Sequence, residues 1–189
     1  MKFFSLFSTT GFSNSYLLGP EAGGDAILVD PGSFDVSLLQ TIEGNRLYAR
    51  WILVTHAHRA HIDGIRALRK VYDARIYSNQ PNVLDFPALH VQDGDMLSLG
   101  GQPVQVIETP GHSIDSVCFR VGDMLFTGDT LSAGTIGSTR NGYARGLLLS
   151  TVRKKILPMG DEVLVFPGHG PPTKIGIEKL YNRYLGEEL

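Results

Sequence analysis

Histidines gather in a few places along this chain, and an acidic residue recurs in the same local setting. Five of the six histidines form three clusters, made up of His56, His58 and His61, of His112, and of His169. Each cluster follows an apolar run that ends in a polar or glycine-containing turn, and Asp129 follows another such run, Met124-Leu-Phe-Thr-Gly. Neutral imidazoles suit a borderline metal such as zinc, and a carboxylate adds an oxygen ligand. The pattern predicts a metal site formed by His56, His58, His112 and Asp129.

A metal site of this composition favours hydrolysis. Bound zinc can lower the pKa of a coordinated water to about 7, which supplies a hydroxide nucleophile at neutral pH. We assign Asp129 both as a metal ligand and as the catalytic residue of such a site. His90 lies outside the three clusters and is expected to be structural. Asp30, in Val29-Asp30-Pro31-Gly32, is expected to stabilise a turn rather than to bind metal.

The elements that must position these residues are short strands alternating with helices. Strands are predicted over residues 3–7, 15–18, 26–29, 51–55, 75–77, 96–99, 104–108, 116–121, 124–127 and 163–166. Helices are predicted over residues 35–43, 62–72, 146–156 and 174–185. The first three strands read as an antiparallel meander. The order predicts an α/β fold in one domain, 1–189, with two packed sheets and helices on their outer faces. Residues 131–145 are interpreted as a functional loop.

Composition sets limits on partners and location. The chain has 189 residues, of which 17 are basic and 19 acidic, and a net charge of -2, so no overall field attracts nucleic acid or anionic membrane. Cys118 is the single cysteine, which excludes an intrachain disulfide and indicates a buried, inert thiol. The N-terminal apolar run is too short for a signal peptide, and no later run reaches about 18 apolar residues. We expect a cytoplasmic protein that acts on a small molecule.

Four motifs together resemble those of the metallo-β-lactamase superfamily. They are Thr55-His-Ala-His-Arg-Ala-His61, Thr109-Pro-Gly-His112-Ser, Thr127-Gly-Asp129-Thr and Pro167-Gly-His169-Gly-Pro. Phe126-Thr-Gly-Asp-Thr-Leu and Phe166-Pro-Gly-His-Gly-Pro are similar to the short glyoxalase II-like branch. The resemblance implies a four-layer αββα sandwich with its metal site at one edge of the sheets. It also implies hydrolysis of a small thioester or ester through a metal-bound hydroxide.

The resemblance also implies a second metal, and the chain departs from the family at one of its ligands. One metal would take His56, His58 and His112, while His61, His169 and an Asp of the first motif would hold the other, with Asp129 bridging. The position of that first-motif Asp is Ala60 here. A missing carboxylate leaves a two-metal site with one more positive charge. We therefore predict one strongly held metal, zinc with iron or manganese as alternatives, and a second site that is weak or empty. Asp63 is expected to cap a helix or face solvent.

Candidate substrate contacts lie after Asp129, where the chain lacks the Gly-Arg-x-Asp-like stretch of the family. Arg140 and Arg145 could clamp an anionic group with paired guanidinium donors, although two solvated loop arginines would look the same in sequence. Tyr143 could offer its hydroxyl to an oxyanion, or it could anchor the loop by packing. These three residues are the candidate substrate-binding set.

Two other functions fit the same residues. One is an iron oxygenase resembling the persulfide dioxygenases of the superfamily, with His56, His112 and Asp129 as a facial triad and open positions for oxygen. A single-metal site agrees with Ala60, although those enzymes normally retain the missing Asp. The other is a non-catalytic metal-binding module. A nuclease is disfavoured because the chain has no basic stripe or added domain.

Overall fold

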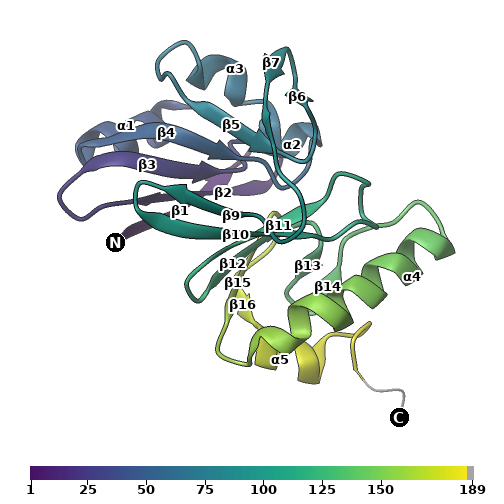
Figure 1. Cartoon of the computed structure of the whole chain (residues 1–189). Coiled ribbons are helices and arrows are strands. Elements are labelled where there is room, and N and C mark those ends of the chain that lie inside the picture. Colours follow the sequence, from purple (N-terminus) through teal and green to yellow (C-terminus); the bar gives the residue numbers. More distant parts are fainter. Residues whose placement is uncertain (187–189) are drawn as a thin grey trace. The chain divides into compact units, whose positions relative to one another are not determined.

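The computed structural model describes residues 1–186, and the chain divides into two compact units. Unit 1 comprises residues 1–91 and 98–102, and unit 2 comprises residues 92–97 and the chain from Pro103 onward. Each unit is built around a six-stranded sheet with helices (Figure 1). The units are described separately below.

The sheet of unit 1 has the order β1-β2-β3-β4-β5-β8. Its strands are β1 (Lys2–Ser8), β2 (Ser13–Gly19), β3 (Gly24–Val29), β4 (Leu47–Leu53), β5 (Arg75–Ser78) and β8 (Leu89–His90). The first three strands form the predicted antiparallel meander, and β3, β4, β5 and β8 are parallel. A small hairpin, β6 (Asn82–Val83) and β7 (Phe86–Pro87), precedes β8. The parallel pairing aligns the carboxyl ends of β3 and β4 at one edge of the sheet.

Helices α1 (Val36–Gly44), α2 (Arg59–Ile62) and α3 (Ile65–Leu68) pack against one face of this sheet. Asp35 is the N-cap of α1, and its Oδ1 accepts a 3.0 Å hydrogen bond from the Leu38 amide. Apolar residues from the helices and from alternate strand positions are fully buried together. Among them are Leu38, Ile42, Ile65, Leu68, Leu17, Leu28 and Ile52. Strand alternation and helix periodicity thus produce a single apolar layer within unit 1.

The helix predicted over 62–72 is wrong in its extent, because α2 ends at Ile62, the helical stretch breaks at Gly64 and α3 covers only residues 65–68. The Gly64 amide donates a 2.9 Å hydrogen bond to the Pro31 carbonyl. A Cβ atom at position 64 would lie 2.6 Å from that oxygen and 2.4 Å from the Ser33 carbonyl carbon. The glycine therefore allows the chain to pack closely against the segment that follows β3. The helical stretch is divided into α2 and α3 at this contact.

The second sheet, which belongs to unit 2 except for the last two residues of β9 and the first of β10, has the order β16-β15-β12-β11-β10-β9. Its strands are β9 (Met96–Leu99), β10 (Gln102–Glu108), β11 (Val117–Val121), β12 (Met124–Gly128), β15 (Leu164–Pro167) and β16 (Thr173–Lys174). Neighbours are antiparallel from β10 to β12, and β12 pairs with β15 in parallel. The carboxyl ends of β12 and β15 therefore lie side by side.

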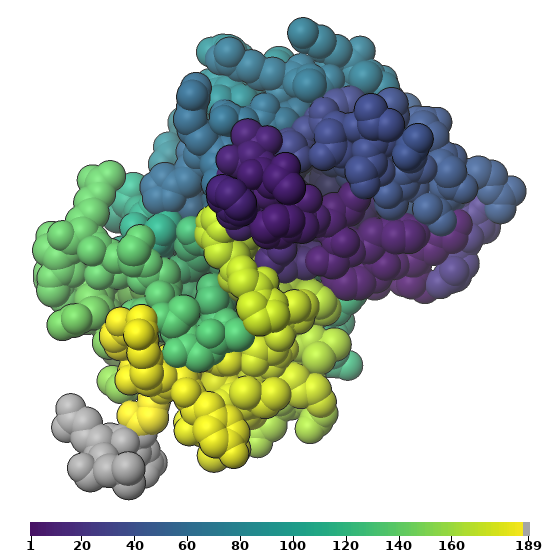
Figure 2. Space-filling view, turned by 180° about the vertical axis from the view of Figure 1, so that it is seen from behind, coloured from purple at the N-terminus to yellow at the C-terminus, as the bar shows by residue number. Residues whose placement is uncertain are grey.

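Helices α4 (Gly142–Thr151) and α5 (Ile175–Tyr181) cover one face of the second sheet. Helix α4 continues as a π-helical segment, Val152–Ile156, and a 3-10 turn, Leu157–Met159. Their buried residues, Leu148, Val152, Ile156 and Ile175, share a core with Ile107, Cys118, Leu125 and Val165. Helix α5, yellow in Figure 2, lies at the surface on the face shown there. The predicted inert environment of Cys118 agrees with its complete burial.

The loop predicted over residues 131–145 contains regular structure, so the prediction that it is irregular is wrong. It holds the hairpin of β13 (Leu131–Ser132) and β14 (Thr135–Ile136), and α4 begins at Gly142 rather than Gly146. Asn141 is the N-cap of α4, and its Oδ1 accepts a 2.9 Å hydrogen bond from the Ala144 amide. Within residues 1–186, no helix combines the length and apolar character needed to cross a membrane.

Candidate metal centre

Unit 1 brings together the three histidines of the first motif. His56 follows β4 and is 1% exposed, His61 lies in α2 and is fully buried, and His58 immediately precedes α2 and is exposed. The ring centroids of His56 and His58 are 4.6 Å apart, and those of His56 and His61 are 4.3 Å apart. The turn from β4 into α2 therefore gathers all three imidazoles, as the sequence predicts.

A buried carboxylate lies beside these histidines, and the sequence prediction of its role was incomplete. Asp30 follows β3 and does form the predicted turn, with its carbonyl accepting a 2.8 Å hydrogen bond from the Gly32 amide. Its side chain, however, reaches across to the end of β4. Its Oδ1 accepts from the Thr55 amide at 2.8 Å, and its Oδ2 lies 3.2 Å from Nδ1 of His61. The parallel pairing of β3 with β4 explains this contact.

Position 60 lies against the loop that joins β1 to β2. The Ser13 hydroxyl donates a 2.5 Å hydrogen bond to the Ala60 carbonyl. A Cβ atom built on Gly11 would lie 2.9 Å from both the Cα and the Cβ of Ala60, so a glycine is required for this approach. Asp63 lies 3.7 Å from the Arg59 guanidinium, one helical turn away, as an exposed ion pair. That pair agrees with the prediction of a solvated role for Asp63.

Unit 2 gathers the remaining candidate ligands at the ends of three strands. His112 follows β10, Asp129 follows β12 and His169 follows β15. Nε2 of His112 lies 3.5 Å from Oδ2 of Asp129, and Nε2 of His169 lies 3.6 Å from the same oxygen. Two ligand atoms at 2.0–2.1 Å from a tetrahedral zinc ion are about 3.4 Å apart. The donor types and spacing within unit 2 therefore fit a metal ion shared by these side chains.

A hydrogen bond to the protein backbone fixes the ring of His112. Nδ1 of His112 lies 2.7 Å from the carbonyl oxygen of Ser138. A carbonyl can only accept, so Nδ1 carries the proton and the lone pair is on Nε2, the atom that faces Asp129. A Cβ atom on Gly137 would lie 1.8 Å from the Asp129 carbonyl oxygen and 3.0 Å from Nδ1 of His112. Sequence reasoning included this segment in the functional loop predicted over residues 131–145, but it did not single out Gly137 or Ser138.

The three candidate substrate-binding residues lie together at the start of α4. Arg140 precedes the cap of the helix, and Tyr143 and Arg145 belong to its first turns. All three are exposed, with Tyr143 81% accessible. The packing role considered for Tyr143 is therefore wrong, because its ring covers little of the protein. Two guanidinium groups and a phenol are available to a ligand on this surface of unit 2.

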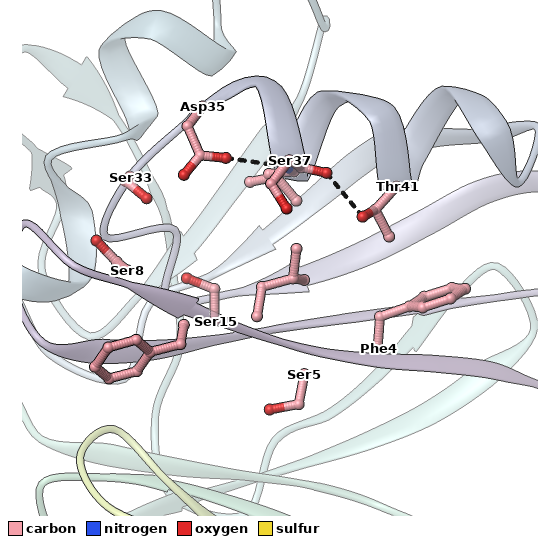
Figure 3. Close-up of a pocket in the computed structure, with 11 residues that line it drawn as sticks. Phe4, Ser5, Ser8, Ser15, Ser33, Asp35, Ser37 and Thr41 are labelled. Carbon is pink, nitrogen blue, oxygen red and sulfur yellow. Dashed lines mark hydrogen bonds between the residues drawn. The ribbon is translucent and has the colours of Figure 1, made fainter.

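Unit 1 also contains a cavity of about 280 Å³ between β1 and the start of α1. Figure 3 shows it lined by several hydroxyl groups, with Asp35 and Thr41 engaged in hydrogen bonds along the helix. Its apolar wall includes Phe4 and Leu38. Among the lining residues described, none belongs to the predicted metal or substrate set. The cavity is thus separate from the candidate ligands of unit 1.

Comparison with known proteins identifies the family to which these motifs correspond. The family model described as the metallo-beta-lactamase superfamily matches residues 8–169, which include every predicted metal-ligating residue. The match runs through both compact units. It agrees with the resemblance read from the motifs and confirms the predicted α/β fold class.

Three individual proteins illustrate the similarity. An uncharacterized protein of Mycobacterium tuberculosis is 36% identical over 91% of this chain and 92% of its own length. The hydroxyacylglutathione hydrolase GloC of Haemophilus influenzae is 30% identical over 87% of this chain and 89% of its own length. The crystal structure of ETHE1 from Myxococcus xanthus is 32% identical, with a TM-score of 0.89, and covers 100% of this chain and 86% of that one.

Proposed function

Because the chain belongs to the metallo-β-lactamase superfamily, we propose that it is a metal-dependent hydrolase of a small thioester or ester. The observation that carries this proposal is the placement of His112, Asp129 and His169 at metal-ligand spacing, after the carboxyl ends of three strands of one sheet in unit 2. The similarity to a hydroxyacylglutathione hydrolase supports a thioester of glutathione as the first substrate class to test.

We propose the two sets of metal ligands that the family motifs imply. The primary set is His56, His58, His112 and Asp129, and the weaker set is His61, Asp129 and His169. Imidazole and carboxylate donors of this kind suit zinc, iron or manganese. The support within unit 1 is the close packing of its three rings, and within unit 2 it is the spacing about Asp129.

The protein residues have definable tasks in such a hydrolase. The metal, when bound, supplies Lewis-acid polarisation and a water of lowered pKa. Asp129 would share the metal with two histidines, since both Nε2 atoms lie within 3.6 Å of its Oδ2. The Ser138 carbonyl keeps the proton of His112 on Nδ1. Arg140 and Arg145 are proposed to bind an anionic group of the substrate through their paired donors.

Metal stoichiometry is the direct test of the site. Ala60 provides no ligand to the weaker set, so we expect about one tightly held equivalent per chain. Ala60→Asp would restore a carboxylate and is expected to raise the content toward two. Elemental analysis of both proteins, purified side by side, measures this. Two tightly held equivalents in the unchanged protein would contradict the role given to position 60.

Activity is tested separately with a panel of acyl-glutathione and other thioesters, using protein loaded with zinc, iron or manganese. Cleavage that disappears in His112→Ala, while the variant keeps its fold by circular dichroism, would support the proposal. A protein that binds metal and cleaves no member of the panel would overturn the thioester assignment. A protein that binds no metal would instead favour a module without catalysis.

An iron oxygenase is the second candidate, favoured by one feature of the chain. Ala60 removes a ligand from the second metal set, which agrees with a single iron held by His56, His112 and Asp129. Oxygen consumption by the iron-loaded protein on addition of glutathione persulfide measures this activity. Uptake without thioester cleavage would replace the hydrolase assignment by the oxygenase.

A further inference from the structure

We propose that the cavity between β1 and the start of α1 binds a small neutral polyol, a compound of the size of a monosaccharide. Its volume of about 280 Å³ lies just below the range of about 300–1,000 Å³ that is usual for ligand pockets, so the occupant must be small. The eleven lining residues described all belong to unit 1, and none is a candidate metal ligand or substrate contact. The site is therefore independent of the proposed metal centre and of its reaction.

The hydroxyl of Ser8 is buried in the wall of this cavity without a hydrogen-bond partner. The residue is 3% exposed, and its Oγ makes no hydrogen bond within residues 1–186. Alternate residues of β1 point to one face, where Phe4 and Leu6 pack against the apolar core of unit 1. Ser8 continues this face with a polar group at a position where the pattern favours an apolar one. Burial of an unbonded hydroxyl costs free energy, so an occupant that bonds it is favoured.

The hydroxyl groups of the lining determine which hydrogen bonds an occupant must make. Six of the eleven lining residues carry a hydroxyl, so the wall is more polar than that of most ligand pockets. Ser15 donates its proton to the Asp30 carbonyl at 2.7 Å, and Thr41 donates to the Ser37 carbonyl at 2.8 Å. A hydroxyl has one proton, so Ser15 and Thr41 can only accept from an occupant, whereas Ser8 can donate or accept. The hydroxyls of a polyol also do both, while an ammonium group only donates and an anion only accepts.

Asp35 provides the single charged side chain among the eleven lining residues. Its Oδ1 accepts from the Leu38 amide, and no cationic side chain within residues 1–186 pairs with its carboxylate. Figure 3 shows Ser8, Ser33 and Asp35 at the same end of the cavity. A carboxylate repels anions and accepts strong hydrogen bonds from hydroxyl groups. The charge therefore disfavours an anionic occupant such as an acyl-glutathione and favours a compound with adjacent hydroxyls.

Apolar side chains form the remainder of the wall. They are Phe4, Leu6, Phe7 and Leu38. Figure 3 places Phe4 and Thr41 at the end of the cavity away from Ser8 and Ser33. A cyclic polyol carries C–H groups between its hydroxyls, and an aromatic ring offers these groups a large apolar surface. The lining thus matches a compound that is hydroxylated and also partly apolar.

Titration of the whole chain, followed by amide proton–nitrogen NMR spectra, tests the proposal. The probes are D-glucose, D-ribose and glycerol, with ethanolamine and inorganic phosphate for comparison. We expect at least one polyol to shift the amides of β1 and of the first turn of α1 with saturation in the millimolar range, while the amides of Gly137 and Ser138 in unit 2 stay unchanged. Absence of saturation with every polyol would overturn the proposal, and saturation with ethanolamine or phosphate alone would overturn the ligand class.

Two substitutions place the binding in the cavity. Ser8→Ala removes the buried hydroxyl, and we expect the affinity for the polyol to fall about 3- to 10-fold. Asp35→Asn keeps an N-cap residue for α1 but removes the carboxylate, so the affinity should fall about 10-fold or more. Thr10→Ala removes an exposed hydroxyl two residues beyond Ser8, outside the lining, and is the matched control with unchanged affinity. Equal affinity in all three variants would show that the polyol binds elsewhere.

Thermal unfolding of the ligand-free protein separates a ligand-binding role of Ser8 from a structural one. The Ser8 hydroxyl makes no hydrogen bond within residues 1–186, so its removal should leave the melting temperature unchanged or raise it. Added polyol should raise the melting temperature of the unchanged protein more than that of Ser8→Ala. A lower melting temperature of ligand-free Ser8→Ala would show that the hydroxyl supports the fold, and would overturn its assignment to a ligand.

Discussion

The carbonyl of Ser138 lies 2.7 Å from Nδ1 of His112, and the preceding residue is a glycine whose missing side chain makes this contact possible. The segment that follows β14 thereby fixes a candidate ligand carried by the turn after β10. The two segments are 26 residues apart in the chain. Their contact shows that the orientation of His112 depends on a loop with no metal ligand of its own.

Gly137→Ala is expected to disturb the ligands of unit 2. The new methyl group would lie 1.8 Å from the Asp129 carbonyl oxygen, so the backbone must move and the Ser138 contact with His112 must lengthen. We expect a loss of metal affinity of about 10-fold or more, measured by competition with a chelator. Gly146→Ala is the matched control, because a Cβ there meets nothing within 4 Å. In the interior of α4 it should stabilise the protein by about 0.5–1 kcal/mol. Equal affinity in the two variants would contradict the prediction.

Glu178→Gln is expected to lower the free energy of unfolding by about 1–3 kcal/mol. Glu178 is 1% exposed, and its carboxylate accepts hydrogen bonds from the Gly134 amide, the Thr173 hydroxyl and the Asn182 side chain. The side-chain amide of Gln has an NH2 group in place of one carboxylate oxygen, so one of these three donors would face another donor and lose its hydrogen bond. Urea denaturation measures the change. Glu162→Gln, which removes an exposed partner of Lys174, should change stability by less than about 0.5 kcal/mol. Similar losses in both variants would argue against a special role for the buried network.

The ion pair of Asp93 with Lys155 should make a small contribution to the free energy of unfolding, and this contribution should depend on pH. Burial raises the pKa of the Asp93 carboxyl, but hydrogen bonds from Lys155 and from the Glu108 amide outweigh it and hold the pKa below its usual value. A lowered pKa in the folded state stabilises the protein above the ordinary pKa of about 3.8 and loses this effect as pH falls through the folded value. The side chains are partly exposed, so the pair contributes about 0.2–1 kcal/mol.

Denaturation of metal-free Asp93→Asn and of the unchanged protein, followed from neutral pH down to about pH 3, measures this term. The difference between the two proteins should be present near neutrality and shrink at the acidic end. A difference that grows as pH falls would contradict the assigned sign. High salt should reduce the difference at neutral pH, because the pair is accessible to solvent.

The thiol of Cys118 is expected to react slowly with a disulfide reagent in the native protein and rapidly in urea. Its side chain is fully buried and contacts the Thr109 hydroxyl and the Thr127 carbonyl. Reaction therefore requires the chain to open, and its rate reports on unfolding. Spectrophotometric titration measures it. Fast labelling of the folded protein would show that this strand is more accessible than its burial indicates.

Local patterns predicted much of the candidate site. Apolar runs that end in Thr, Pro or Gly turns indicated strands, and the histidines and Asp129 follow those strands in the structure. The early strands were also correct, because β1, β2 and β3 are joined by tight turns and pair with their neighbours in sequence. In these cases each residue and the element that positions it are adjacent in the chain.

Features that depend on distant contacts were not predicted. The break at Gly64 arises from its close approach to Pro31 and Ser33, and no helical period records such a contact. The role of the Asp30 side chain requires that β3 and β4 be parallel neighbours. The hairpin of β13 and β14 has two residues in each strand, too few for alternation to be recognised. Asn141 could have indicated the start of α4, since Asn is a common N-cap residue of helices.

The hydrogen bond from Ser15 to the Asp30 carbonyl, and those that Asp30 accepts from Thr55, are made entirely by protein atoms. The conformational entropy of Ser15, Asp30 and Thr55 is therefore lost when the chain folds and not when a metal ion binds. In zinc fingers, by contrast, the apo chain is unfolded and the metal drives folding. Metal uptake by this protein should resemble a small ligand entering a prepared pocket, with a modest change in heat capacity and little change in circular dichroism.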